Sequence, residues 1–190
     1  MAELSVKRLK TSLPICKIHR PFVGSRVKQS LRRVAYRLDA LANIFEQDDI
    51  ALPRVAAFFH EHSEQEQAQA EAMLDYLSDR GGQYCNKDIQ RPGCEEVCAV
   101  IPALELMLGQ WKEEMAVMVE LSQLSKEHSD PHSASVVKSR FLGPLVPCVK
   151  LLGDLLTNAR RVGCTIDRSG GFGEYLINQL QEELTNVTSG

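Results

Sequence analysis

Residues 53–82 read PRVAAFFHEHSEQEQAQAEAMLDYLSDRGG, and this stretch decides the fold class. A stripe of mainly apolar residues recurs along it at steps of three and four: Val55, Phe59, His62, Glu66, Gln69, Met73 and Leu77. That spacing is typical of an α-helix with one face turned inward. Pro53 suits the first turn of a helix, and Gly81-Gly82 suits its C-terminal end. We therefore predict a long helix over about 50–79.

Three other long segments, at about 22–46, 100–127 and 132–161, have the same period. Their stripes are, in chain order, Val27, Leu31, Val34, Leu38, Leu41 and Phe45; then Leu104, Leu108, Trp111, Met115 and Met118; then Phe141, Leu145, Cys148, Leu152 and Leu155. A shorter helix is expected at about 173–185. Four long amphipathic helices predict an all-α four-helix bundle with a short fifth helix, and the connection over 83–96 is long enough for a crossover.

The helix boundaries carry further signals. Asp48-Asp49 offers an N-cap for the helix at 50–79, and Asp130-Pro131 starts the last long helix. That last helix contains a fault, because Pro144 and Pro147 lie in its middle. Each proline removes a helical hydrogen bond and clashes with the preceding turn, at a cost of about 3 kcal/mol or more. We predict a kink or break between Leu142 and Val149.

Charge is divided unevenly along the chain. Residues 1–37 carry ten Lys and Arg and one acid, whereas the other residues carry twelve Lys and Arg and twenty-four acids. The basic segment could bind nucleic acid or an anionic membrane, could be a mitochondrial transit peptide, or could be solvated chain that leads into the first helix. We expect a basic, disordered extension over 1–21, one domain over 22–185 and a tail over 186–190. No run of apolar residues is long enough to span a membrane, and six cysteines without a secretory leader indicate reduced thiols in the cytoplasm.

The inward stripe of residues 53–79 contains one pair that suits metal chemistry, Glu66-x-x-Gln69. A di-iron site in a helical bundle needs glutamates from two helices and Glu-x-x-His pairs from the others, because iron prefers oxygen ligands that also balance its charge. The facing stripes supply leucine, tryptophan and methionine. We expect Glu66 to be a buried, hydrogen-bonded group near His62 and Gln69, with its pKa raised by burial. A residual site for a single metal ion is the alternative.

Six short strings make the chain resemble the vertebrate ferritins over about residues 30–180. They are FEQDDIAL at 45–52, RGG at 80–82, DIQRP at 88–92, DPH at 130–132, LGDLLTN at 152–158 and GFGEYL at 171–176. The resemblance implies a ferritin-like bundle with a long crossover between the second and third helices. It also implies a hollow cage of twenty-four subunits that stores iron as a ferric mineral, without an organic cofactor. Apolar residues of the last helix would line the fourfold axes, namely Phe172, Leu176 and Leu180.

The resemblance also places the iron-oxidising centre of active ferritins on this sequence. Its positions fall on Leu31, Leu38, Glu66, Gln69, Trp111 and Leu145. Only Glu66 has the residue of the active pattern, so we expect no catalytic residue and no ferroxidase activity. Trp111 and the leucines are expected to fill the space that iron would occupy.

Two other iron-handling surfaces are altered by comparison with the family. The positions where light-type chains nucleate mineral are Glu61, Glu64, Gln65, Ala68 and Glu71, of which three are acidic. Without a cage, the same glutamates would be an ordinary solvated helix face. The acids of the threefold pore correspond to Ser135 and Lys138, and three lysines around one axis would repel ferrous ions.

These features predict an iron-storage shell subunit that assembles with ferroxidase-active ferritin chains or with copies of itself. Two alternatives remain open at this point. One is a ferroxidase with a rearranged site, which would need new carboxylates near Glu66. The other is a degenerate ferritin-fold protein with a role outside storage, such as nucleic-acid binding through the basic segment.

Overall fold

The computed structural model describes residues 22–81, 97, 99–162 and 173–178. Three uninterrupted long helices are α3 (Phe22–Phe45), α4 (Pro53–Asp79) and α5 (Val100–Glu127). The fourth long helical path is made of α6 (Pro131–Val136), η1 (Val137–Leu142) and α7 (Gly143–Val162), followed by a helical turn at 173–178. The described residues contain no strand, so the predicted all-α fold is confirmed.

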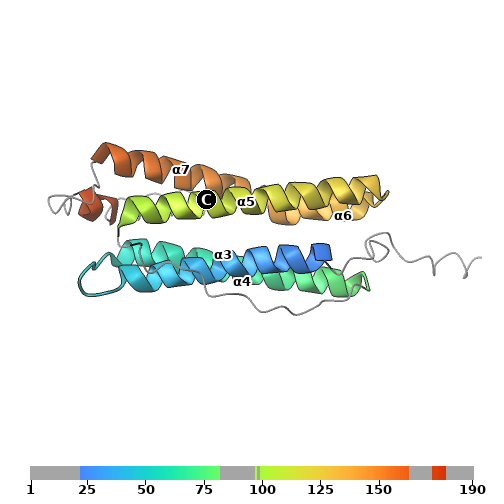
Figure 1. Ribbon diagram of the computed structural model, residues 1–190, viewed down its shortest axis with the longest axis horizontal. Helices are drawn as coiled ribbons and strands as arrows, with labels where there is room; N and C mark the ends of the chain where they lie inside the picture. Colours follow the sequence, from blue (N-terminus) through green and yellow to red (C-terminus); the bar gives the residue numbers. More distant parts are fainter. Residues whose placement is uncertain (1–21, 82–96, 98, 163–172, 179–190) are drawn as a thin grey trace, which may run out of the picture.

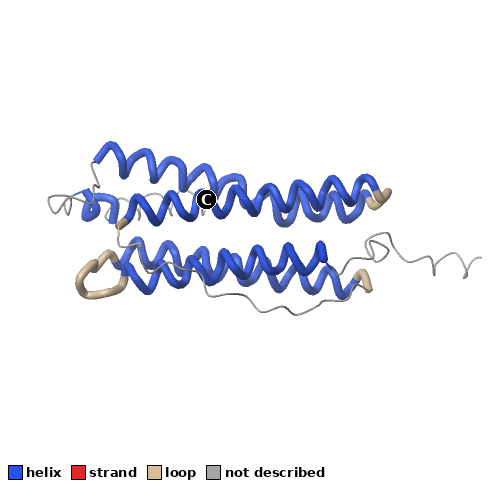
Figure 2. The backbone as a smooth tube through the Cα atoms, viewed as in Figure 1, coloured by secondary structure: helices blue, strands red, loops and turns tan. Residues whose placement is uncertain are grey.

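The helices form two antiparallel pairs that lie one on the other (Figure 1). α3 and α4 make one pair, and α5 makes the other with the path from α6 to α7. α4 ends at the opposite end of the bundle from the start of α5, so the chain between Arg80 and Ala99 has to cross its whole length. This is the long crossover that the sequence predicted, although most of the connecting residues lie outside the described part. Figure 2 shows the helices with short loops at the bundle ends.

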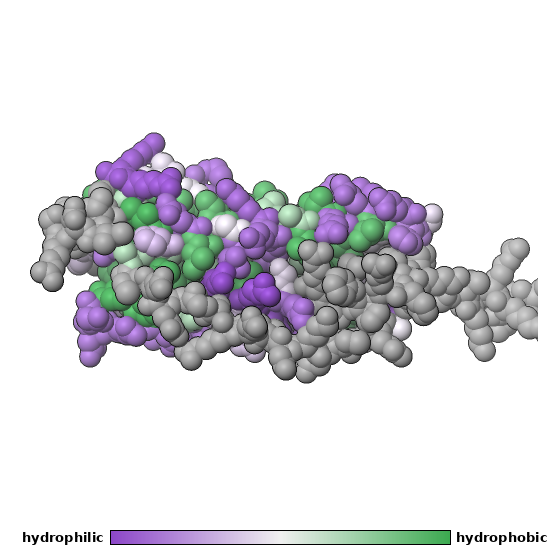
Figure 3. Space-filling model, viewed as in Figure 1, coloured by the Kyte–Doolittle hydropathy of each residue, from purple (hydrophilic) through white to green (hydrophobic). Residues whose placement is uncertain are grey.

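Most residues of the inward stripes are buried where the sequence predicted them, whereas Leu108 and Met115 on α5 are only half-buried. All six stripe residues of α3 are buried, from Val27 to Phe45. The core has two clusters, a larger one containing Phe45, Phe59 and Trp111 and a smaller one containing Leu31 and Phe141. The face drawn in Figure 3 has both hydrophobic and hydrophilic side chains along the helices, and a strongly hydrophilic group lies near its centre. Within the described residues, the helices include none that combines the length and apolar character needed to cross a membrane.

The predicted N-cap of α4 is wrong. Turns after Phe45 leave Asp48 and Asp49 exposed, and Leu52 is the cap residue, with no side-chain cap bond of its own. The cap is supplied by Asn178 instead. Its Oδ1 atom accepts hydrogen bonds from the backbone N–H groups of Arg54, at 2.9 Å, and of Val55, at 3.3 Å. The helical turn at 173–178 therefore holds the start of α4, a contact between residues far apart in sequence.

The same turn supports the start of α5. The Oε1 atom of Glu174 accepts a hydrogen bond of 3.2 Å from the backbone N–H of Val100. Ala99, the N-cap residue of α5, makes no side-chain cap bond. Each of these carboxyl or amide oxygens satisfies an N–H group that has no partner inside its helix.

Of the kink or break predicted between Leu142 and Val149, the break does not occur. α7 begins at Gly143 and continues through Pro147. The irregularity lies one turn earlier, where η1 is a π-helix and the N–H of Gly143 bonds to the carbonyl of Lys138, five residues back. This change of register places Pro144 in the first turn of α7, where a missing N–H costs little, and the wider π turn accommodates its ring.

The far end of the bundle follows the sequence prediction. Gly81 has a φ of 72°, the left-handed conformation that a glycine after a helix adopts. The Oδ1 atom of Asp130 caps α6 by accepting from the backbone N–H of Ser133 at 3.1 Å. The other carboxyl oxygen of Asp130 pairs with Arg80 at 2.5 Å, which ties the end of α4 to the start of α6.

Candidate functional site

A cavity of about 40 Å³ lies in the middle of the bundle, where the two core clusters meet. Side chains from all four long helical paths line it: Leu31, His62, Gln65, Glu66, Gln69, Glu114, Phe141, Pro144, Leu145 and Cys148. A single buried water needs about 10–15 Å³, so the cavity has room for more than one. The expectation that apolar bulk would fill this space is therefore wrong.

The cavity brings together four of the six positions that the family resemblance marked, Leu31, Glu66, Gln69 and Leu145. Leu38 is buried in the larger core cluster and does not line the cavity. Trp111 does not line it either, because its ring packs edge-on against His62, with 5.2 Å between the ring centroids. The indole therefore lies beside the cavity, and the space near Gln69 stays open.

Glu66 is buried, as predicted, and its hydrogen-bond donor is Trp111. The indole Nε1 donates to Oε1 of Glu66 over 3.0 Å. Burial raises the pKa of Glu66 from its ordinary value of 4.5 to about 7, and the bond from Trp111 opposes that rise because it favours the charged form. A carboxyl with this pKa is partly protonated at neutral pH.

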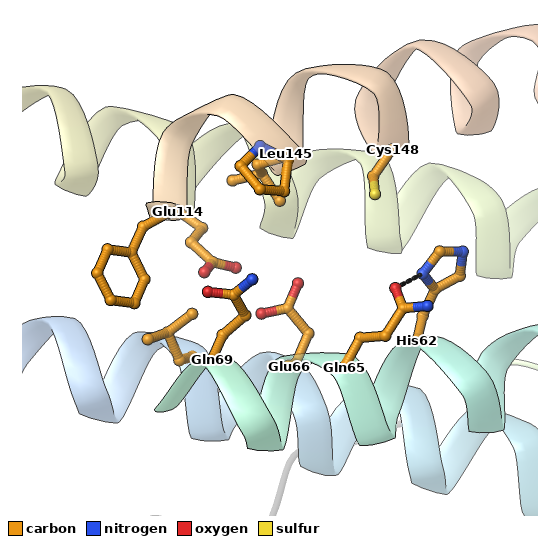
Figure 4. A pocket seen from close by; sticks show the side chains of 10 residues that line it. His62, Gln65, Glu66, Gln69, Glu114, Leu145 and Cys148 are labelled. Carbon is orange, nitrogen blue, oxygen red and sulfur yellow. Dashed lines mark hydrogen bonds between the residues drawn. The ribbon is translucent and has the colours of Figure 1, made fainter. Parts of the chain in front are cut away.

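The predicted neighbours of Glu66, His62 and Gln69, line the same cavity, but the hydrogen-bond partner of His62 is Gln65. The Nδ1 atom of His62 is 3.1 Å from Oε1 of Gln65, which lies three residues later on the same helix (Figure 4). Burial lowers the pKa of His62, and the bond to Gln65 only partly offsets this. His62 is therefore neutral at neutral pH and supplies no positive charge to the cavity.

Glu114 is the site residue that the sequence prediction missed. It is buried on α5 with only 1% of its surface exposed, and its Oε2 atom has no hydrogen-bond partner. Burial and the neighbouring charge of Glu66 raise the pKa of Glu114 well above its ordinary value. Figure 4 shows Glu66, Gln69 and Glu114 pointing into the same space.

The spacing along α5 contains the signal that would have found Glu114. The buried residues alternate in steps of three and four through Leu104, Met107, Trp111, Glu114, Met118 and Leu121. The predicted stripe contained Leu108 and Met115 instead, and both are only half-buried. Glu114 was missed because the residues of the predicted stripe were chosen for their apolar character, although Glu114 lies at a regular inward position.

Cys148 completes the wall of the cavity on the α7 side. It is a free, half-buried cysteine. Burial raises the pKa of its thiol to about 11, and the carboxyls of Glu66 and Glu114 act in the same direction. The thiol therefore stays protonated at neutral pH, which makes it a poor metal ligand and a poor nucleophile.

The donor set does not fit a pair of irons. Two carboxyl groups and the amides of Gln65 and Gln69 are the oxygen donors of the cavity wall. In the described part of the chain, no three His, Cys, Asp or Glu residues are grouped so that they could hold a metal ion. The ligands that a di-iron centre takes from four helices are thus incomplete here.

The other predicted site residues lie on the surface. Glu61, Glu64, Gln65, Ala68 and Glu71 are all exposed on α4. Ser135 and Lys138 are exposed near the junction of α6 and η1. Leu176 is half-buried in the helical turn at 173–178, whereas Phe172 and Leu180 lie outside the described residues.

Comparisons with known proteins agree with this architecture. The family model described as the ferritin-like domain matches residues 30–162. The chain is 33% identical to ferritin light chain 1 of Mus musculus over 153 residues, which cover 78% of this chain and 84% of the mouse protein. It is 32% identical to the middle subunit of ferritin from Aquarana catesbeiana over 145 residues, or 76% of this chain and 81% of the frog protein. Soma ferritin of Lymnaea stagnalis is 32% identical over 145 residues, or 76% of this chain and 80% of the snail protein.

Proposed function

The chain belongs to the ferritin family, and from that premise we propose that it is a shell subunit for iron storage without an intact di-iron oxidation centre. It would assemble in the cytoplasm with ferroxidase-active ferritin chains into a shell of twenty-four subunits. The partner chains would oxidise the iron, and this chain would supply wall and mineral-nucleating surface. Iron is the cargo in this proposal.

The observation that carries the proposal is the composition of the interior cavity. By the family resemblance, Leu31, Trp111 and Leu145 would stand at ligand positions of an active centre, and Glu66 accepts a hydrogen bond from the indole of Trp111. Two irons need several carboxylates to balance their charge, and this cavity offers only Glu66 and Glu114. We therefore expect the chain alone to oxidise iron(II) far more slowly than an active ferritin.

The exposed acids of α4 support a role in mineral formation. Glu61, Glu64 and Glu71 are exposed to solvent, and Oε1 of Glu61 accepts a hydrogen bond of 3.3 Å from the side-chain amide of Gln65. Oxygen ligands of this kind suit hard cations such as iron(III). Lys138 supports the need for a partner, because an exposed lysine at the threefold pore would repel iron(II), and partner subunits would supply acidic pores.

The test compares three samples: the chain alone, a ferroxidase-active ferritin alone, and both refolded together. Particle size is measured by light scattering, and bound iron is measured after aerobic loading with iron(II). Mixed shells that contain this chain and hold more iron per active subunit than active shells alone would support the proposal. A chain that never enters a mixed shell would refute it.

A matched variant isolates the nucleating surface. Glu61, Glu64 and Glu71 are replaced together by alanine, and the mixed shells are loaded again. Because these side chains are exposed, the variant is expected to fold and assemble normally. Slower mineral growth at an unchanged rate of iron(II) oxidation is the expected result, and an unchanged growth rate would remove nucleation from the proposal.

A further inference from the structure

The interior cavity has two carboxyl groups on its wall and no basic side chain to balance them. Its described lining residues include neither Lys nor Arg, and its histidine, His62, has a lowered pKa. Oε1 of Glu66 accepts a hydrogen bond from Trp111. Oε2 of Glu114 has no partner, although Glu114 is only 1% exposed. A buried carboxyl oxygen without a partner costs free energy, so this oxygen calls for an explanation.

The rest of the cavity wall is mainly apolar. Its apolar members are Leu31, Phe141, Pro144, Leu145 and Cys148. The thiol of Cys148 is neutral, because burial raises its pKa to about 11. A hydrated metal ion does not suit such a wall, and the described residues offer no group of three metal-ligating side chains. The wall suits a cationic group that is attached to a short hydrocarbon stem.

We propose that this cavity binds the primary ammonium group of an aliphatic amine, either a free alkylamine or the tip of a lysine side chain from another protein chain. An ammonium group has three N–H donors and no acceptor. Three oxygen-bearing side chains, Glu66, Gln69 and Glu114, point into one space from α4 and α5 (Figure 4). One donor would reach Oε2 of Glu114, and the positive charge would balance the carboxyl pair. Hydrogen bonds between an ammonium and a carboxylate are among the strong ones.

The stem of the amine has a way out of the bundle. Gln65 and Pro144, on α4 and α7, line the cavity and are themselves exposed. The cavity therefore opens outward between these two helices. Its volume of about 40 Å³ is roughly three times what one water needs, which suits one ammonium group and its first methylene groups. The methylene groups would lie against Leu145 and Cys148.

This site goes beyond the proposed storage function and does not depend on it, because all of its groups belong to one subunit. Its test uses the iron-free full chain, so it succeeds or fails separately from shell assembly and iron loading. Trp111 is the only tryptophan of the chain, and its indole donates to Glu66 over 3.0 Å. Tryptophan fluorescence therefore reports on a change at this carboxyl group.

The probe is n-butylamine at pH 8, where an alkylamine is charged as lysine is. It is expected to change the fluorescence of Trp111 in a saturable way at millimolar concentration and to raise the Tm, because it binds only the folded chain. Tetramethylammonium chloride is the matched control salt, since it has the same charge and no N–H donor. From methylamine to propylamine, affinity should rise about 3- to 4-fold for each methylene group that is buried.

Two variants locate the binding. Glu114→Gln keeps the size of the side chain, removes its charge and is expected to weaken binding about 10- to 100-fold. Glu66→Gln is the second variant, with an expected loss of the same order. Glu113→Gln is the matched control, because Glu113 is the exposed neighbour of Glu114. Circular dichroism checks that each variant folds.

A third probe distinguishes the two sources of the ammonium group. The methylamide of Nα-acetyl-lysine has the lysine side chain on a short piece of backbone. If it binds as well as n-butylamine, the opening admits a lysine from another chain. If only n-butylamine binds, the site is one for a free alkylamine. If neither binds, the proposal is refuted and the carboxyl pair is neutralised by protons alone.

Three other results would also overturn the proposal. An equal response to tetramethylammonium would mean an effect of ionic strength. A response that survives both Glu114→Gln and Glu66→Gln would place the amine elsewhere. A response that disappears when Glu61, Glu64 and Glu71 become alanine would assign it to the exposed face of α4.

Discussion

Replacing Glu66 by glutamine is expected to leave the stability of the metal-free chain almost unchanged at pH 5 and to raise it at pH 8. Glutamine has the shape of a protonated glutamate, and its carbonyl oxygen can still accept the bond from Trp111. The substitution therefore removes the ionisation and keeps the contact. Chelator in the buffer keeps divalent ions out of the cavity.

The direction follows from the two pKa values of Glu66. Its pKa is about 7 in the folded chain and 4.5 when it is exposed. Between these values the folded chain holds a proton that the unfolded chain has released, so stability falls as the pH rises through this window. Below pH 4.5 both states are protonated and the penalty vanishes, whereas above pH 7 both are ionised and the penalty is constant.

The magnitude comes from the same shift. A shift of one pKa unit corresponds to about 1.4 kcal/mol, so the penalty grows by roughly 2 to 3 kcal/mol between pH 5 and pH 8. Glu66 is only 8% exposed, so solvent screens this effect little. For a chain of this length, that free energy corresponds to a difference in Tm of roughly 5–10 °C.

The assay is thermal unfolding followed by circular dichroism at both pH values. Wild type, Glu66→Gln and the exposed control Glu113→Gln are compared, so that pH effects on the shell and on other groups cancel in the differences. The Tm of Glu66→Gln should exceed that of wild type only slightly at pH 5 and clearly more at pH 8. An equal difference at the two pH values would mean that Glu66 keeps an ordinary pKa and that the reasoning from burial is wrong.

Three further changes probe the contacts that hold the bundle. Trp111→Phe leaves the Glu66 carboxyl without its donor and is expected to cost about 1–3 kcal/mol in urea unfolding; a smaller loss would mean that water replaces the indole. Asn178→Ala removes the acceptor at the start of α4 and should lower the free energy of unfolding by about 0.5–2 kcal/mol; no loss of thermal stability would argue against docking of the turn at 173–178. Gly81→Ala forces a side chain into a φ of 72° and should cost about 1–2 kcal/mol, whereas Gly81→Asn should cost less, and equal losses would contradict a purely conformational cause.

The sequence alone was sufficient for the long helices and for most of their inward residues. The stripe from Val27 to Phe45 is buried along its whole length, because the period of an α-helix fixes which residues share a face. Gly81 and Asp130 also act as predicted, since each works on backbone groups within a few residues of itself. Such local effects are decided before distant parts of the chain meet.

Two outcomes that the sequence did not predict are the cap of α4 and the helical path around Pro144. The start of α4 is capped by Asn178. Its side-chain oxygen accepts a hydrogen bond from the backbone N–H of Arg54, which lies 124 residues earlier in the chain. Pro144 is accommodated because the preceding turn widens into a π-helix inside the packed bundle. Neither the capping partner nor the wider turn has a local sequence signal.

The sequence likewise predicted only some of the residues of the candidate site. The sequence placed Glu66 and Gln69 on the inward face of α4, and both line the cavity. Glu114 was passed over because the stripe was chosen by apolar character, although its position has the right period. Whether an inward acid is paired, orphaned or open to an ion depends on which side chains face it across the bundle. Tertiary packing decided this, by turning the Trp111 indole toward Glu66 and leaving Oε2 of Glu114 without a partner.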